Sequence, residues 1–203
     1  MHIGGTDFDK YLSLSSVMPL LGYGSRLRNN SEVPSSYFFD LATWHTINQA
    51  YTKKMWTQLS DLLRDSAEQE KLGRLQRLID ERAGHWLAMK VEEGKIALSD
   101  DVKVRLELDR LAPAVSLELD RAQFDASIDH LVGSVENTVL SLLKDAGVGP
   151  ADVDTVFFTG GSSGVRMLRE RIGALVPAAR KVEGDLFGSI GAGLALDAVR
   201  KFG

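Results

Sequence analysis

The chain has 203 residues, a formal net charge of −4 at pH 7 and no cysteine. This length suits one compact domain or two small ones, and the acidic balance argues against nucleic acid as a main partner, because phosphate binding needs clustered Lys and Arg. Disulfides, thiolate zinc sites and cysteine nucleophiles are excluded, and with no apolar run of membrane-spanning length and no signal peptide we expect a soluble, cytoplasmic protein without a membrane partner.

The first half of the chain has a helical pattern. Apolar residues recur near helical spacing over residues 9–18, and a loop rich in Gly, Ser, Asn and Arg follows over residues 22–36. The helical pattern returns over residues 37–63. Over residues 68–98 it predicts one long helix that bends at Gly84.

Strand patterns follow the long helix. Residues 102–108 alternate strictly between apolar and charged side chains, and residues 114–119 alternate too, which predicts an antiparallel hairpin packed against that helix. The remaining elements predict an α/β unit in the order α-β-α-β-α. They are a helix with Asp120 as its N-cap, a buried strand over residues 153–158, a helix over 165–175, a short strand over 179–182 and a helix over 187–199.

Two glycine turns stand out in this second part. Thr159-Gly160-Gly161-Ser162 follows the strand at residues 153–158, and a second glycine-rich turn covers residues 184–193. A strand that leads into a glycine turn and then a helix brings backbone N–H groups and a helix N-terminus against a phosphate or a sugar. We therefore expect any ligand of this chain to contact these turns.

Four segments, in this order, resemble motifs of the heat-shock protein 70 family, whose ATPase domain has an actin-like, ribonuclease-H-like fold. They are residues 2–9, 92–99, 159–162 and 184–193. The resemblance spans essentially the whole chain and is closer to the YegD-like branch of these chaperones, through residues 18–22, 92–99 and 187–189. It implies part of the second ATPase lobe, with an outer subdomain of helices plus hairpin at residues 1–119. Half of the inner α/β subdomain then follows at residues 120–203.

The resemblance also implies a nucleotide site. Glu92 and Lys95, three residues apart on a helix, would hold the ribose hydroxyls, and Ser99 would reach the base edge. At Gly160 and Gly161 the backbone would pass close to the adenosine and the α-phosphate, and Gly5 would lie near the phosphates. The implied nucleotide-binding residues are Gly5, Glu92, Lys95, Ser99, Gly160, Gly161, Ser162 and Asp185.

Simpler interpretations of these residues stay open. Glu92 and Lys95 can form a solvated helix pair, and Asp185 can be a plain N-cap. The Gly-Gly-Ser segment can be only a turn in which Ser162 caps the next helix. Two arginines that usually stack on adenine in this family are replaced here by Ile96 and Gly164. The aromatic residues Trp44, Tyr51 and Trp56 are expected in the core, and the four histidines show no metal-ligand spacing.

The resemblance implies an ATP-dependent, stress-related molecular chaperone that binds ATP or ADP with Mg²⁺. The first-lobe phosphate loop, the catalytic lysine and the second phosphate loop have no counterpart in the sequence. We therefore expect a fragment with no catalytic residue and no Mg²⁺ ligand of its own, and no ATPase activity from this chain alone. The main alternative is a non-catalytic interaction module that binds an exchange factor, co-chaperone or client through the outer subdomain. A Rossmann-type cofactor domain is a third option, disfavoured because Gly188, Gly191 and Gly193 lie too near the C-terminus to begin a βαβ unit. An exposed sheet edge would also allow self-association.

Overall fold

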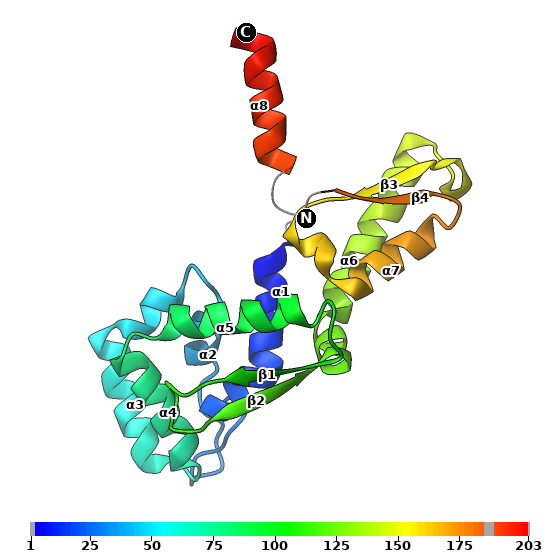
Figure 1. The fold of residues 1–203 in the computed structure, drawn as a ribbon. Helices are drawn as coiled ribbons and strands as arrows, with labels where there is room; N and C mark the ends of the chain where they lie inside the picture. The colour runs from blue at the N-terminus through cyan, green and yellow to red at the C-terminus, as the bar shows by residue number, and fades with distance from the viewer. Residues whose placement is uncertain (1–2, 185–188, 203) are drawn as a thin grey trace. The chain divides into compact units, whose positions relative to one another are not determined.

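The computed structural model describes residues 3–184 and 189–202. Its internal contacts define two compact units. The helical unit is Thr6–Ile128, and the α/β unit is Asp129–Gly203 together with the N-terminal residues up to Gly5. The helix α6 (Arg121–Ala146) runs from one unit into the other (Figure 1). No helix in the described ranges is long and apolar enough to cross a membrane.

The helical unit begins as the sequence predicts. The first helix, α1 (Gly5–Leu12), continues through a π-helical turn, η1 (Ser13–Val17), into a 3-10 helix, η2 (Met18–Leu21). Helical backbone over residues 9–18 is therefore confirmed, and it ends at Gly22, which has a left-handed φ of 103°. The loop that follows is mostly exposed, as expected, but it contributes the buried side chain of Val33 to the core.

The pattern over residues 37–63 forms three elements rather than one. They are α2 (Ser36–Ala42), the 3-10 helix η3 (Ile47–Tyr51) and α3 (Lys53–Asp65). The helix α3 begins where the Thr52 side chain accepts a hydrogen bond from the backbone N–H of Met55. A side-chain oxygen at this position satisfies one of the free N–H groups of the first turn, which sets the helix start.

The single long helix predicted over residues 68–98 is wrong. Two helices occupy this stretch, α4 (Gln69–Asp80) and α5 (Gly84–Ala97). The helix α4 ends because Arg82 takes a left-handed φ of 49°, and the N–H of Ala83 then donates to the carbonyl of Leu78 at 2.9 Å. This is the Schellman helix ending, which usually has glycine where Arg82 stands.

Gly84 opens α5 and does not bend a helix. A Cβ at this position would lie 2.6 Å from Cγ2 of Ile47 and 2.6 Å from Oη of Tyr51. The backbone N–H of Gly84 also donates to Oη of Tyr51 at 2.8 Å. A glycine is needed here because α5 starts in direct contact with η3.

The predicted hairpin is confirmed. Strands β1 (Lys103–Glu107) and β2 (Ser116–Asp120) pair antiparallel, and Leu106 lies opposite Leu117. Leu106 and Leu119 are buried on the side that packs on α5. Asp120 is the predicted N-cap of α6, since its Oδ1 accepts from the N–H of Ala122 at 2.8 Å.

The core of the helical unit lies between α1, α2, α4 and α5 (Figure 1). Large apolar side chains from each of these helices are almost completely enclosed, at about 1.5–3 kcal/mol of stabilisation each. The most enclosed are Phe8, Leu12, Phe38, Leu41, Leu72, Leu75, Leu78 and Leu87.

The α/β unit contains a parallel pair of strands joined by a helix. Strand β3 (Thr155–Phe158) pairs with β4 (Arg180–Glu183), and α7 (Arg166–Leu175) connects them. The short 3-10 helices η4 (Pro150–Asp152) and η5 (Gly161–Gly164) stand on either side of β3. The terminal helix is α8 (Ser189–Phe202), and the first residues predicted for it lie outside the described ranges.

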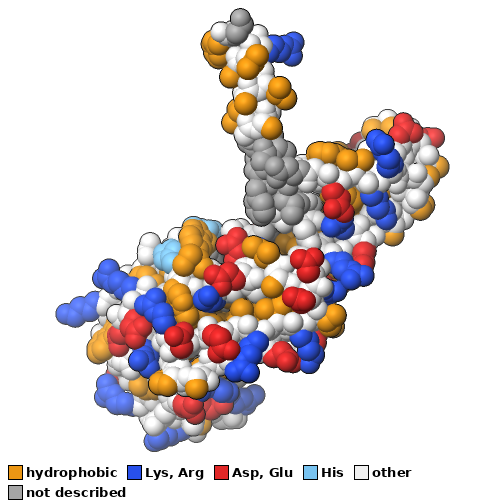
Figure 2. Space-filling view, in the orientation of Figure 1, with side chains coloured by type: hydrophobic (Ala, Val, Ile, Leu, Met, Phe, Trp, Pro, Cys, Tyr) orange, Lys and Arg blue, Asp and Glu red, His pale blue; other side chains and the backbone are white. Residues whose placement is uncertain are grey.

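The α/β unit leaves apolar side chains exposed. Strand β3 was expected to be buried, which is wrong for one of its faces: Phe158 is 8% exposed and Phe157 is 58% exposed. Successive side chains of a strand point to opposite faces, and Arg169 of α7 lies over the Phe158 ring at 5.9 Å, so α7 covers the face opposite to Phe157. Figure 2 shows apolar side chains along α8, and those of Leu196 and Val199 are 73% and 70% exposed.

An arginine joins α7 to α6 within this unit. Arg171 donates from Nε to Oε1 of Glu136 at 2.8 Å, pairs a second time with the same carboxylate, and reaches Oδ1 of Asp129 at 2.6 Å. A two-point contact between a guanidinium and a carboxylate fixes both distance and orientation. These contacts hold α7 against the middle of α6.

Candidate functional site

The helix α5 carries the two residues expected to hold a ribose. Glu92 is exposed, whereas Lys95 is only 9% exposed. The Nζ of Lys95 lies 2.8 Å from Oδ1 of Asp9 on α1. The alternative of a solvated helix pair is therefore wrong for Lys95, which forms an ion pair inside the unit.

Asp9 is a part of this site that the sequence did not single out. Burial raises the pKa of its carboxyl above the ordinary value, the nearby Lys95 ammonium opposes that rise, and the negative charge of Glu92 adds to it. Three charged groups from two helices are thus coupled. The sequence offers no signal for the pairing, because Asp9 and Lys95 lie far apart along the chain.

Ser99 does not lie on α5. The helix ends at Ala97, and Ser99 stands in the turn that follows, where its N–H donates to the carbonyl of Ile96 at 3.0 Å. Ile96 itself is 53% exposed and presents an apolar surface beside this turn. The sequence predicted Glu92, Lys95 and Ser99 along one helix. The helix α5 contains Glu92 and Lys95 and ends before Ser99.

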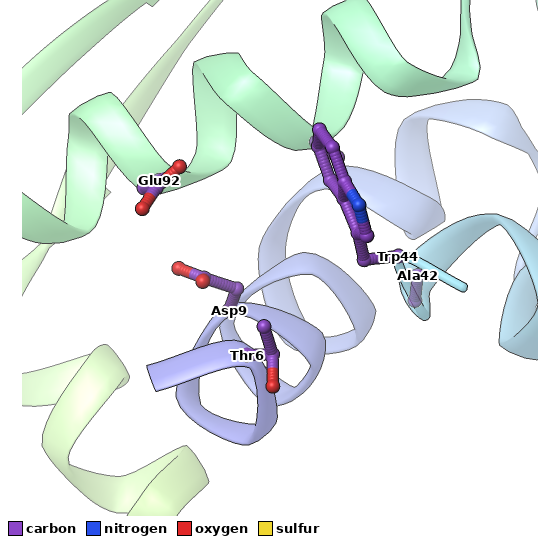
Figure 3. Close-up of a pocket in the computed structure, with 6 residues that line it drawn as sticks. Thr6, Asp9, Ala42, Trp44 and Glu92 are labelled. Carbon is purple, nitrogen blue, oxygen red and sulfur yellow. The ribbon is translucent and has the colours of Figure 1, made fainter. Parts of the chain in front are cut away.

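A cavity of about 210 Å³ opens beside Glu92. Figure 3 shows Glu92 on α5 and Asp9 on α1 turned toward the same space, with Trp44 as a further wall. The lining residues are Thr6, Asp9, Ala42, Trp44, Ala88 and Glu92. The cavity therefore shares Glu92 with the predicted nucleotide site, while Lys95 and Ser99 do not line it.

Trp44 departs from its expected place in the core. Its side chain is 47% exposed, and its indole meets the ring of His85 edge to face, with centroids 4.9 Å apart and planes at 85°. Trp56 is also exposed, at 42%. The helical spacing of Trp44, Tyr51 and Trp56 did not predict their burial correctly, because residues 37–63 fold as three separate elements.

The first glycine turn has a backbone that only glycine adopts readily. Gly160 has φ 82° and ψ 152°, and a Cβ built there would meet no atom within 4 Å. Glycine is therefore required by the backbone conformation at this position and not by contact with neighbouring atoms, and the space beside Gly160 is open. The Oγ of Ser163 donates to the carbonyl of Gly160 at 2.7 Å and braces the turn. The helix α7 has Val165 at its N-cap and no side-chain cap, so Ser162 does not cap it.

We expect Gly160→Ala to lower the free energy of unfolding by about 1–3 kcal/mol, because alanine in this region of φ and ψ is strained. The measurement is urea denaturation followed by circular dichroism. Gly161→Ala is the control, since Gly161 lies in a 3-10 helix whose φ suits any residue. Equal losses of stability in Gly160→Ala and Gly161→Ala would contradict the conclusion that the backbone conformation at position 160 requires glycine.

The remaining predicted residues fall in separate places. Gly5 begins α1, and Asp185 lies outside the described residues. Glu92, Lys95 and Ser99 belong to the helical unit, and Gly160 to Ser162 belong to the α/β unit. Across the part of the chain that the structure describes, no group of three or more His, Asp or Glu side chains is arranged to hold a metal.

Comparison with known proteins settles the family. The model of the Hsp70 protein family matches residues 55–198, which is more than half of the chain. The chain belongs to the Hsp70 family. This confirms the family resemblance, and the mixture of helices and small sheets agrees with part of an Hsp70 ATPase lobe.

Curated relatives match a shorter stretch. The chaperone protein HscA of Salmonella paratyphi B and that of Salmonella heidelberg are each 42% identical over 79 residues. The matched stretch is 39% of this chain but only 12% of each relative. These comparisons support an Hsp70-like chaperone.

Proposed function

We propose that this Hsp70-family chain is the adenosine-binding part of an ATP-dependent chaperone of the YegD-like branch. The observation that carries the proposal is the family match over residues 55–198, which includes both α5 and the turn at Gly160. The open space beside Gly160, together with a φ that requires glycine there, supports a turn built to admit a ligand.

In this proposal the exposed Glu92 carboxylate accepts hydrogen bonds from the two ribose hydroxyls. Lys95 acts mainly as a positioning residue, because its ammonium is paired with Asp9 and little exposed. Gly160, Gly161 and Ser162 stay proposed contacts of adenosine, as the family resemblance implies. Gly5, Ser99 and Asp185 stay proposed contacts of the same nucleotide.

The proposed cofactor is ATP or ADP. Mg²⁺ would accompany the phosphates in the complete chaperone, where it neutralises charge that develops during phosphoryl transfer. No described residue is proposed as its ligand. The ATPase cycle, co-chaperones and clients are proposed for the parent protein alone, since this chain matches a small part of its relatives.

Titration calorimetry with adenosine, ADP, ATP and NAD tests the proposal. We expect adenosine to bind the full chain, and Glu92→Gln to weaken binding at least about tenfold, because a hydrogen bond to a charged acceptor contributes about 1.5–3 kcal/mol. Glu93→Gln is the matched control. Glu93 is the exposed neighbour on α5 and pairs with Lys90 at 2.6 Å, outside the cavity.

The other results have defined meanings. Adenosine binding that Glu92→Gln leaves unchanged would contradict the assigned ribose contact. NAD binding tighter than ADP would contradict the nucleotide class. An absence of heat with all four ligands would favour the alternative, a protein-interaction module that uses the helical unit.

We also propose that the α/β unit self-associates through an exposed edge of its sheet. Within the described ranges β3 and β4 each have one unpaired edge, and α8 exposes apolar side chains, which supports this proposal (Figure 2). Parallel sheets are normally covered on both faces, and unpaired edges attract strands from other chains.

A further inference from the structure

The cavity in the helical unit reaches from Glu92, the proposed ribose contact, one helical turn back along α5 to Ala88. Ala88 and Glu92, four residues apart on α5, form one wall, and Thr6 and Asp9 on α1 form another. Residues further along α5, including Lys95, do not line it. The space is therefore separate from the surface that Lys95 and Ser99 would offer to a nucleotide, although Glu92 borders both.

One wall is an aromatic ring held in a fixed orientation. The Trp44 indole is half exposed and packs edge to face with His85, which is half-buried on the first turn of α5. Ala42 and Ala88 end in methyl groups, so space remains beside the ring for a flat group. Figure 3 shows the indole and the Glu92 carboxylate on opposite sides of this space.

The polar lining is acidic. Carboxylates of Asp9 and Glu92 face the cavity, and no Lys or Arg is among its lining residues. Lys95 does not line the cavity, but its Nζ lies 2.8 Å from Oδ1 of Asp9 and balances the charge of that carboxylate. The lining therefore keeps one net negative charge, that of Glu92. An aromatic face and a carboxylate across a small space together favour a cation.

The volume limits the size of this cation. Cavities that enclose a whole drug-sized ligand measure about 300–1,000 Å³. At about 210 Å³ this one suits a single side-chain-sized group. A guanidinium fits better than an ammonium, because it is planar, stacks on an indole and presents parallel N–H donors to a carboxylate.

We propose that this cavity binds a guanidinium group, stacked on Trp44 and hydrogen-bonded to Glu92. The group can come from the arginine side chain of a partner protein or from a free guanidino compound. This site goes beyond nucleotide binding, and because both sites use Glu92, adenosine and the guanidinium compete.

Titration of agmatine and of N-acetyl-arginine-amide into the full chain, followed by the indole N–H signals in NMR spectra, tests the proposal. We expect saturable binding in the millimolar range, as suits one cation–π contact and one charged hydrogen bond. Trp44→Leu and Glu92→Gln should each weaken it at least about fivefold. Trp44→Phe should retain part of the guanidinium binding, because phenylalanine still offers an aromatic ring on which the group can stack.

Two control variants leave the cavity intact. Trp56→Phe removes the other exposed indole, whose Nε1 donates to Asp80, and Glu93→Gln removes the neighbouring carboxylate. Neither should change guanidinium binding. Trp44→Leu should leave the heat of adenosine binding unchanged, so the failure of one site is distinguishable from the failure of the other.

The source of the group follows from the two probes. Tighter binding of N-acetyl-arginine-amide than of agmatine assigns the site to a partner's arginine, and the reverse order assigns it to a free compound. Butylamine that binds as well as agmatine would overturn the guanidinium assignment. No saturable shift, or shifts that persist in Trp44→Leu, would overturn the site itself.

Discussion

Replacing Lys95 by Met is expected to lower the free energy of unfolding by about 3–5 kcal/mol at pH 7, because it leaves the largely buried Asp9 carboxylate, whose side chain is 19% exposed, without its cation. Methionine keeps most of the apolar part of the lysine side chain. The loss of stability therefore measures the missing charge and not a packing defect. Urea denaturation followed by circular dichroism measures it. Lys90→Met is the control: Lys90 sits on the same helix and pairs with the exposed Glu93, and its loss should stay within about 0.5 kcal/mol.

The pH dependence of this variant has a defined sign. Burial raises the pKa of Asp9 in the folded state, and the loss of Lys95 removes the group that opposes this rise. The folded variant therefore binds a proton that the unfolded chain, with its ordinary pKa of 3.8, does not bind until lower pH. Consequently the variant regains stability as the pH falls through the folded pKa of Asp9.

Asp9→Asn combined with Lys95→Met isolates this effect. The double variant has no carboxylate at position 9, so its deficit relative to the parent chain should lose the recovery at low pH. A double-mutant cycle then gives the coupling energy of the pair. A deficit in Lys95→Met that does not shrink between pH 7 and the ordinary pKa of Asp9, 3.8, would contradict the assignment of the loss to an ionised Asp9.

Elements with local signals were predicted well. Strict alternation predicted the hairpin, and an acidic residue before an apolar helical pattern predicted the start of α6 at Asp120. Both signals depend on neighbours in the sequence. The end of α4 was missed because Arg82 occupies the left-handed position that glycine usually marks.

The candidate site was predicted only where one helix carries it. Spacing placed Glu92 and Lys95 on α5, but the partner of Lys95 is Asp9, which tertiary packing of α1 brings to it. Trp44 was assigned to the core because its spacing matched a helix that the fold interrupts after Ala42. The cavity between these elements has no sequence signature, since α1, α5 and the segment after α2 each supply one wall.

Replacing Phe8 by Ala is expected to lower the free energy of unfolding by about 3–5 kcal/mol, the usual loss for a fully buried phenylalanine. The Phe8 side chain is 1% exposed and lies on α1, whose other face carries Thr6 and Asp9. The matched control is Phe39→Ala, because Phe39 is 39% exposed and should cost less than about 1 kcal/mol. Urea denaturation of both variants makes the comparison.

The conservative variant Phe8→Leu separates packing from the site. It keeps most of the buried volume, so its loss should stay near about 1.5 kcal/mol, while the ion pair between Asp9 and Lys95 persists. If Phe8→Leu, combined with Lys95→Met, removes the pH dependence assigned to Asp9, then α1 has shifted and its core contact sets the geometry of the charged cluster. If the pH dependence stays and only stability falls, Phe8 supports the unit as a whole and the cluster is positioned by α5.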